Sequence, residues 1–225
     1  MQVTLHTTQG SETKDVSITK AIVAGWTGRD RVALEKHIVE LEELGVARPT
    51  STPIYYRVAA TRVSDAATIQ TTGVASSGEV EFVLAQWGGV MWVGVGSDHT
   101  DREVETYNVT VSKQMCEKPV AREFWRFADV AAHWDQIVMR SWIEENGARV
   151  LYQEGSVVAM LDPLTLIEGY EGKSALDDGA IMLCGTFAAK GGIRPSDRFE
   201  FEIHDPVLGR TIRHAYTLDK LPVLG

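Results

Sequence analysis

The stretch GEVEFVLAQWGGVMWVGVGSDHTDRE, residues 78–103, joins two strand-like segments to a dense group of ionisable residues. The segments EVEFVLAQW and VMWVGVG are rich in β-branched and aromatic residues, and Gly88 and Gly89 lie between them as a turn signal. GSDHTDRE, residues 96–103, then places three acids, a histidine and an arginine within eight residues. Either a surface turn or a metal site accounts for such a group directly after an apolar strand.

The acidic residues of this stretch are spaced so that they can share a site. Glu79 and Glu81 are two residues apart on the first strand, so their side chains point to the same face of the sheet. Two carboxylates so placed repel each other unless a cation or a proton compensates. If the two strands are neighbours, Asp98 at the end of the second strand meets this pair. Three carboxylates, completed by waters, suit Mg²⁺, with Mn²⁺ or Ca²⁺ as alternatives.

The same residues also fit a structural interpretation. An E-x-E pair is typical of the solvated face of a half-exposed sheet. The loop that follows fits a surface turn in which Asp101 and Arg102 form an ion pair, and such pairs contribute roughly 0–1 kcal/mol to stability. The residue spacing alone leaves both interpretations open.

The rest of the chain is strand-rich, with two expected helical regions. Asp30 as N-cap and Gly45 as C-cap residue predict an amphipathic helix over residues 31–46. A second helical region, in two pieces broken near Asp129, is expected over residues 120–147, and a strand is expected over residues 106–112. RFEFEIHD and RTIRHAYTL predict a hairpin around DPVLG. The chain lacks the βαβα rhythm of a Rossmann-like fold, so we predict an α+β fold with mixed or antiparallel sheets.

Composition narrows the classes of function. The chain has 225 residues, which suits one domain, and its formal net charge is -9. Nucleic acid and anionic membrane surfaces are therefore disfavoured as partners, because both require a basic face. No apolar run reaches the roughly 18 residues of a membrane span, and no nucleotide-binding glycine motif occurs. Cys116 and Cys184 form no C-x-x-C motif, and we expect reduced thiols and a cytoplasmic location.

Several motifs resemble those of the fumarylacetoacetate hydrolase superfamily. Its members carry an E-x-E pair on one strand, followed by a G-x-x-N-D-x-[ST]-x-R-[DE] motif. GEVEFVLA resembles the first, and GSDHTDRE resembles the second with Ser97 in place of the usual Asn. Asn146, Gly147 and Gln153 are similar to the family's N-G-x-x-x-Q segment, with two extra residues before the Gln.

A fourth segment agrees with the same family. LDDGAIMLCGT, residues 176–186, is similar to L-x-x-G-D-x-I-x-x-G-T, with Ala180 where Asp is usual. All four pieces occur in the family's order and span residues 22–218.

The resemblance implies a β-rich mixed sandwich roll of the fumarylacetoacetate hydrolase type, with two helical insertions. It implies a single domain over residues 1–225. Residues 1–50 would provide N-terminal strands and a lid helix, and residues 51–225 the β-rich catalytic core. By the same resemblance Glu79, Glu81 and Asp98 bind a divalent metal, usually Mg²⁺, and the protein is a homodimer.

The expected helix carries a candidate acid–base pair. His37 and Glu40 are three residues apart and share a helix face, so Glu40 can orient His37 and stabilise its protonated form. They resemble the H-x-x-E pair on the lid of family hydrolases that cleave acylpyruvates. Alternatively, His37 lies beside Leu34 and Leu41 at the edge of the core.

Four further residues are candidates for substrate contacts. Lys113 falls where the family often has a lysine, and either binds a substrate carboxylate as part of the catalytic set or is a solvated lysine at a strand end. Gln153 either hydrogen-bonds the substrate or satisfies buried backbone. Thr186 offers a hydroxyl and an N–H group to an oxyanion, or simply forms a turn. Arg57 can reach the pocket from a strand whose other face packs.

The predicted activity is a divalent-metal-dependent hydrolase that cleaves a carbon–carbon bond in a small 2-oxo acid or 1,3-dicarbonyl compound through a metal-bound enolate. His37, held by Glu40, would deprotonate the attacking water, while Lys113 and Gln153 would position the substrate. One alternative is a decarboxylase, hydratase or isomerase of a 2-oxo acid at the same metal site. Another is a non-catalytic ligand-binding protein on the same scaffold.

Overall fold

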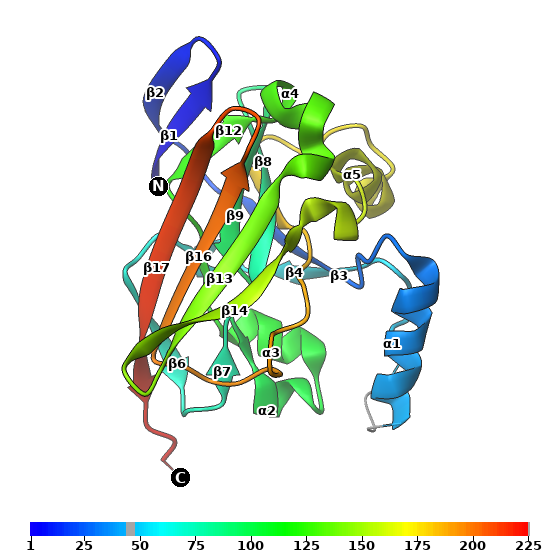
Figure 1. Ribbon diagram of the computed structural model, residues 1–225, viewed down its shortest axis with the longest axis vertical. Helices are drawn as coiled ribbons and strands as arrows, with labels where there is room; N and C mark the ends of the chain where they lie inside the picture. The colour runs from blue at the N-terminus through cyan, green and yellow to red at the C-terminus, as the bar shows by residue number, and fades with distance from the viewer. Residues whose placement is uncertain (44–47, 225) are drawn as a thin grey trace.

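The computed structural model describes residues 1–43 and 48–224, and within the first helix the side chains of residues 37, 40, 41 and 43 lie outside this description. Two large sheets pack face to face (Figure 1). The larger sheet has eight strands in the order β2-β1-β12-β9-β8-β15-β3-β4. These strands are β1 (Gln2–Thr7), β2 (Gly10–Asp15), β3 (Lys20–Gly25), β4 (Ile54–Val58), β8 (Val80–Trp87), β9 (Val90–Ser97), β12 (Glu123–Arg126) and β15 (Ala180–Leu183).

The second sheet has five strands in the order β14-β13-β16-β17-β6. They are β6 (Thr68–Thr72), β13 (Val138–Glu145), β14 (Ala148–Ser156), β16 (Arg198–Asp205) and β17 (Arg210–Leu221). Its inner face contributes large side chains to the core between the sheets, among them Phe199, Phe201 and Tyr216. β16 and β17 pair antiparallel, with Asp205 opposite Arg210, so the predicted hairpin is confirmed.

Strands β8 and β9 form the centre of the larger sheet, as the opening stretch of sequence suggests. They pair antiparallel from Val80 opposite Ser97 to Trp87 opposite Val90. Gly88 and Gly89 make the turn between them with positive φ values of 62° and 74°, a conformation that costs glycine little. All eight residues of β8 are buried, because the sheet is covered on both faces. The E-x-E pair therefore does not lie on the wet face of a half-exposed sheet.

The second predicted helical region is largely wrong. Within residues 120–147 only α4 (Phe127–Val130) and the 3₁₀ segment η2 (Ala131–Gln136) are helical, and the flanks form β12 and β13. Phe124 and Trp125 are both buried, and β12 lies between β1 and β9. Burial on both faces removes the alternation that distinguishes a strand from a buried helix, so the apolar spacing of this segment was misleading.

Two further differences concern helices. The strand expected over residues 106–112 is wrong, because the chain instead forms α2 (Arg102–Glu105) and α3 (Val109–Met115), with the Asn108 side chain accepting a hydrogen bond from Val111 N. A helix that we did not predict, α5 (Pro163–Glu171), begins at the N-cap Asp162. The remaining short elements are η1 (Ala60–Arg62), β5 (Val63–Ser64), β7 (Ser76–Ser77), β10 (Thr100–Asp101), β11 (Lys118–Pro119) and η3 (Val157–Ala159).

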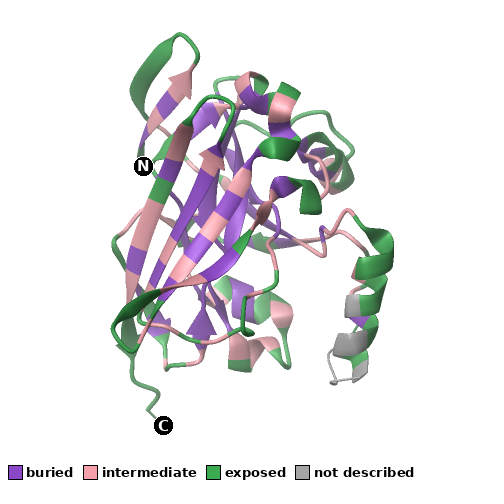
Figure 2. Cartoon of the chain, viewed as in Figure 1, coloured by how far each residue is buried: buried purple, intermediate pink, exposed green. Residues whose placement is uncertain are grey.

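The first predicted helix is confirmed as α1 (Arg31–Glu43), although its expected C-cap, Gly45, lies outside the described residues. Asp30 caps it, since its Oδ1 atom accepts hydrogen bonds from Val32 N (2.9 Å) and Ala33 N (3.1 Å). The helix projects from the sheets and is mostly exposed (Figure 2). The α+β, β-rich fold class is confirmed. Among the described helices, none is long and apolar enough to cross a membrane.

Candidate metal centre

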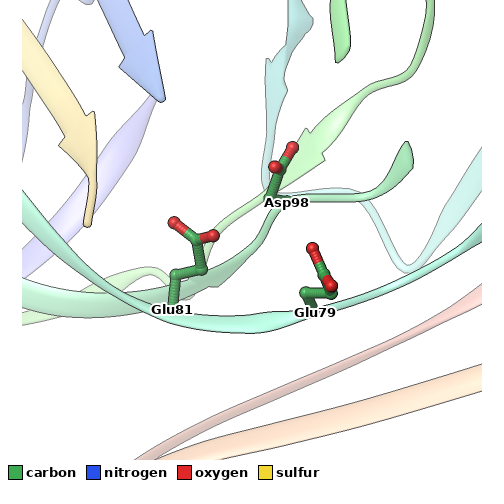
Figure 3. Close-up of side chains that lie close together, drawn as sticks. All are labelled: Glu79, Glu81 and Asp98. Atoms are coloured by element: carbon green, nitrogen blue, oxygen red, sulfur yellow. The ribbon is translucent and has the colours of Figure 1, made fainter. Parts of the chain in front are cut away.

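The predicted acidic cluster forms where β8 begins and β9 ends. Because these strands are antiparallel, the start of one lies beside the end of the other, and Asp98 N extends the ladder by donating to Glu79 O at 3.0 Å. Glu79, Glu81 and Asp98 each offer a carboxylate oxygen, and these atoms lie within 4.8 Å of one another. Figure 3 shows Glu79 and Glu81 on one segment and Asp98 on the neighbouring one, all close together.

Burial raises the free-energy cost of ionising the carboxylates of this cluster. Glu81 is 3% exposed and Asp98 is fully buried. Burial and the neighbouring Asp98 raise the pKa of Glu81 well above its ordinary value, while Gly185 N donates a hydrogen bond to Glu81 Oε2 at 2.8 Å. Burial alone would also raise the pKa of Asp98, but Lys113 and Lys118 outweigh it and hold that pKa below its usual range. The site thus favours the ionised form of Asp98 and disfavours a second buried anion beside it.

Three cations surround the carboxylates. Lys113, in α3, donates to Asp98 Oδ2, and Lys118 Nζ lies 2.9 Å from Asp98 Oδ1 while donating to His99 O at 2.6 Å. Arg102 Nη2 lies 3.4 Å from Glu79 Oε1. The fully buried Lys118 was missed by sequence reasoning, because no acidic partner lies near it at strand or helix spacing. Burial lowers the pKa of Lys118 below its ordinary value, with Asp98 opposing this effect.

The residues present fit a hard divalent cation. All three converging donors are carboxylate oxygens, which is the ligand chemistry that Mg²⁺, Mn²⁺ and Ca²⁺ prefer. Glu81 also faces the cluster without a lysine or arginine ion pair among the described residues, so a bound cation would offset the burial and the repulsion from Asp98 that raise its pKa. Glu79, Glu81 and Asp98 would hold the ion.

Lys113 lies at this cluster and is buried, so it is not the solvated lysine at a strand end that the sequence allowed. Its ammonium group lies 5.7 Å from the centre of the Tyr56 ring. The structure therefore brings Lys113 beside the carboxylates, and its catalytic role stays a prediction.

The Gln153 side chain makes four hydrogen bonds. Its Oε1 atom accepts from Val80 N and Ser141 Oγ, both at 2.9 Å, and its Nε2 atom donates to Thr186 Oγ1 (2.8 Å) and Phe187 O (2.7 Å). These four bonds use the full capacity of a carboxamide. Of the two roles left open by the sequence, the contacts match the satisfaction of buried backbone. Thr186 lies next to Gly185 and so stands at the edge of the cluster.

Arg57 is not brought to the cluster. Along β4 alternate side chains point to opposite faces, and it is Tyr56 that faces Lys113. The Arg57 side chain is exposed and lies 3.4 Å from the Tyr170 hydroxyl on α5, which packs against the other face. A strand pattern does not say which face carries the site, so the sequence could not tell that Tyr56, and not Arg57, lies on the face of the acidic cluster.

The side chains of His37 and Glu40 lie outside the described residues. The chain that leads into their helix nevertheless runs past the cluster. A Cβ atom added to Gly185 would lie 1.8 Å from Thr27 Oγ1, so Thr27 packs directly on the backbone that donates to Glu81. Helix α1 begins four residues later, at Arg31.

Comparisons with known proteins agree with this fold. A family model described as "Protein of unknown function (DUF2848)" matches residues 24–216. No curated protein matches the chain. Two similar solved structures are that of Cg1458 (TM-score 0.64, 14% identity, covering 95% of this chain and 81% of that one) and that of a fumarylacetoacetate hydrolase from psychrophilic Exiguobacterium antarcticum (0.58, 14%, 94% and 82%).

A third similar structure is that of 2-keto-3-deoxy-D-arabinonate dehydratase complexed with magnesium and 2,5-dioxopentanoate. Its TM-score is 0.63 at 14% identity, and the match covers 95% of this chain and 78% of that one. At these identities the likeness establishes the fold. The resemblance to the fumarylacetoacetate hydrolase superfamily is thereby confirmed at the level of architecture.

Proposed function

The chain belongs to the DUF2848 family and has a fumarylacetoacetate hydrolase-type fold, and from this premise we propose that it is a divalent-metal-dependent enzyme. Its substrate would be a small 2-oxo acid or 1,3-dicarbonyl compound, in which it cleaves a carbon–carbon bond by hydrolysis. The observation that carries this proposal is the convergence of Glu79, Glu81 and Asp98 within 4.8 Å in a buried setting. When bound there, Mg²⁺ supplies Lewis-acid polarisation of substrate oxygen atoms.

Neighbouring residues orient the carboxylates of the cluster for metal binding. Gly185 N–H orients Glu81, and Lys118 holds Asp98 from the buried side. Lys113, between Asp98 and Tyr56, would bind a substrate carboxylate, and its position beside the cluster supports this role. Hydrogen bonds and ion pairs of this kind would hold the carboxylate side chains in one orientation, which favours metal binding.

The acid–base step is assigned to His37 and Glu40. The imidazole takes a proton from water, and the resulting hydroxide attacks the distal carbonyl carbon. The bond from that carbon to its neighbour then breaks, and the neighbouring carbon keeps the electron pair and gains a proton. The start of α1 close to Thr27 and Gly185 supports this assignment, because it anchors the helix at the edge of the site.

A second candidate keeps the site and changes the reaction. One structure with the same fold is that of a dehydratase complexed with magnesium and an oxo-acid, which favours dehydration, decarboxylation or isomerisation of a 2-oxo acid as the alternative. A non-catalytic ligand-binding protein is the remaining alternative. The homodimer and the cytoplasmic location stay predictions.

The test combines a substrate screen with one substitution. Acylpyruvates, oxaloacetate and related oxo-acids are incubated with the purified protein and Mg²⁺ or Mn²⁺, and products are followed by mass spectrometry. Glu81→Gln keeps an oxygen that can accept from Gly185 N but removes the charge, so we expect turnover to fall at least about 100-fold. Glu200→Gln, in an exposed ion-pair network on the outer face of β16, is the matched control and should retain full activity.

A different set of results would support the non-catalytic alternative. If neither metal raises the melting temperature, and Glu81→Gln leaves both folding and ligand binding unchanged, the metal-dependent enzyme is ruled out. Product masses separate hydrolysis, which adds water, from decarboxylation, dehydration and isomerisation.

A further inference from the structure

A hydrogen-bonded group lies behind the acidic cluster, on the side facing the second sheet. The Tyr216 hydroxyl, from β17, lies 3.0 Å from Ser97 Oγ and 2.8 Å from His99 Nδ1. Ser97 and His99 are the residues on either side of Asp98. Tyr216 is fully buried, and its ring meets the His99 ring edge to face at 5.6 Å.

The same hydroxyl also touches the segment that carries Glu79. A Cβ atom added to Gly78 would lie 2.6 Å from the Tyr216 hydroxyl oxygen and 2.8 Å from Ser97 Oγ. Only a residue without a side chain allows this approach. Gly78 immediately precedes Glu79, so one oxygen atom lies beside Gly78 and also bonds the side chains of Ser97 and His99 on either side of Asp98.

Side chains alternate between the two faces of a strand, and this alternation puts the Tyr216 hydroxyl on the other face of the sheet from the three carboxylates. Ser97 lies opposite Val80, whose side chain is in the core between the sheets, whereas Asp98 comes one residue later. Tyr216 therefore reaches Ser97 and His99 from the inter-sheet side, and none of its hydrogen bonds goes to the carboxylates of Glu79, Glu81 or Asp98.

The hydroxyl is also the main polar contact of a buried imidazole. His99 is 1% exposed, and its Nε2 atom has no hydrogen-bond partner among the described residues. A buried ring with a single hydrogen bond depends on Tyr216 for its orientation.

We propose that Tyr216 is a positioning residue for the metal site: its hydroxyl fixes the backbone of residues 97–99 against Gly78, so that the three carboxylates stay within reach of one cation. This inference rests on the proposed function. Residues that orient metal ligands without touching the metal typically change metal affinity by about 10–100-fold.

The experiment measures Mn²⁺ binding to the full chain by electron paramagnetic resonance of free Mn²⁺ and by titration calorimetry. Tyr216→Phe keeps the ring and removes the hydroxyl, and its Kd for Mn²⁺ should rise about 10–100-fold. Tyr152→Phe is the matched control, because Tyr152 is equally buried and its hydroxyl accepts from Arg194 N at 3.2 Å. This control should bind Mn²⁺ like the wild type, at a similar melting temperature.

Each outcome decides the question. Equal affinity of Tyr216→Phe and wild type, or equal weakening in both tyrosine variants, overturns the positioning role while leaving the proposed function intact. Failure of the wild type to bind Mn²⁺ overturns both. If Tyr216→Phe does not fold, Ser97→Ala takes its place: it removes one of the two hydroxyl contacts, and an unchanged Mn²⁺ Kd in that variant overturns the inference.

Discussion

Gly185 is the residue at which backbone conformation and the candidate site depend most directly on each other. Its φ is +101°, and its N–H group donates to Glu81 Oε2. A side chain here would meet Thr27 Oγ1 at 1.8 Å. The absence of a side chain thus allows the chain before α1 to pack on the backbone that orients the Glu81 carboxylate of the cluster.

We predict that Gly185→Ala destabilises the protein by more than backbone strain alone. A left-handed conformation costs a residue with Cβ roughly 1–2 kcal/mol, and overpacking adds about 1–3 kcal/mol. Gly147→Ala is the control, because Gly147 has φ +75° but no atom within 4 Å of its added Cβ. Urea unfolding should show a clearly larger loss for Gly185→Ala, and equal losses would contradict the crowding.

The pH dependence of stability has a contribution from His214. Burial lowers the pKa of His214, whose Nε2 atom lies 3.2 Å from Ala66 O. The unfolded chain therefore binds this proton more readily than the folded protein. The stabilisation is fully present above the ordinary histidine pKa and is lost as the pH falls from there through the lower pKa of the folded protein.

His214→Gln should therefore flatten the acid side of the stability profile. Free energies of unfolding measured in urea at pH 8 and pH 5 should differ less in the variant than in the wild type. His6→Gln, at an exposed pair with Glu123, serves as the comparison. An unchanged slope in His214→Gln would remove this residue from the acid response.

At the scale of elements, α1 and α5 show how capping signals and burial act separately. Asp30 and Asp162 both cap their helices through side-chain oxygens. α5 then buries Leu166 and Ile167 in the core between the sheets, whereas Ile38 is the one buried side chain among those described in α1. The same local signal therefore starts one helix that is part of the core and one that stands outside it.

Removing each cap should have different consequences. Asp162→Ala should lower the free energy of unfolding by about 0.5–2 kcal/mol, because α5 unfolds with the core. Asp30→Ala should leave that value within about 0.5 kcal/mol and instead speed hydrogen exchange in α1 alone. Mass-detected hydrogen exchange with urea unfolding on both variants measures this. A global loss in Asp30→Ala would show that α1 is part of the cooperative core.

At the scale of the whole molecule, Gln153 joins the two large sheets at the site. From β14 it reaches Val80 N at the start of β8, and it also holds Thr186 and Phe187 after β15. All four bonds lie in the interior or at its edge. One side chain thus adds buried hydrogen bonds to the apolar contacts that join the strand bearing Glu81 to the second sheet.

Gln153→Leu should be strongly destabilising, because Val80 N and Ser141 Oγ lose a buried acceptor. A buried donor left without a partner costs about 1–3 kcal/mol. Gln70→Leu is the control, since Gln70 is exposed and bonds Asp219 at the surface. Urea unfolding of both variants gives the comparison. A Gln153 variant as stable as the control would mean that water replaces the lost acceptor.

The sequence by itself determined the strand-rich α+β class, the β8–β9 pair, the capped start of α1, the C-terminal hairpin and the three carboxylates of the cluster. Each depends on local spacing: a separation of two positions from Glu79 to Glu81, a glycine pair between strands, an Asp before a helix. α5 carried local signals as well, with Asp162, Pro163 and Gly172 at its ends.

Only the tertiary structure decided the rest. β12 is buried on both faces, which hides its period, whereas β13 alternates buried and half-buried residues but places Ser141 inward and Trp142 outward, so its apolar residues do not alternate. Lys118 reached Asp98 itself, and Tyr216 and Gln153 reached residues beside the three carboxylates, all from other segments of the chain; contacts between such segments leave no spacing in the sequence. The face of β4 that carries the site was fixed by packing, since alternation gives two faces without saying which one is turned to the carboxylates.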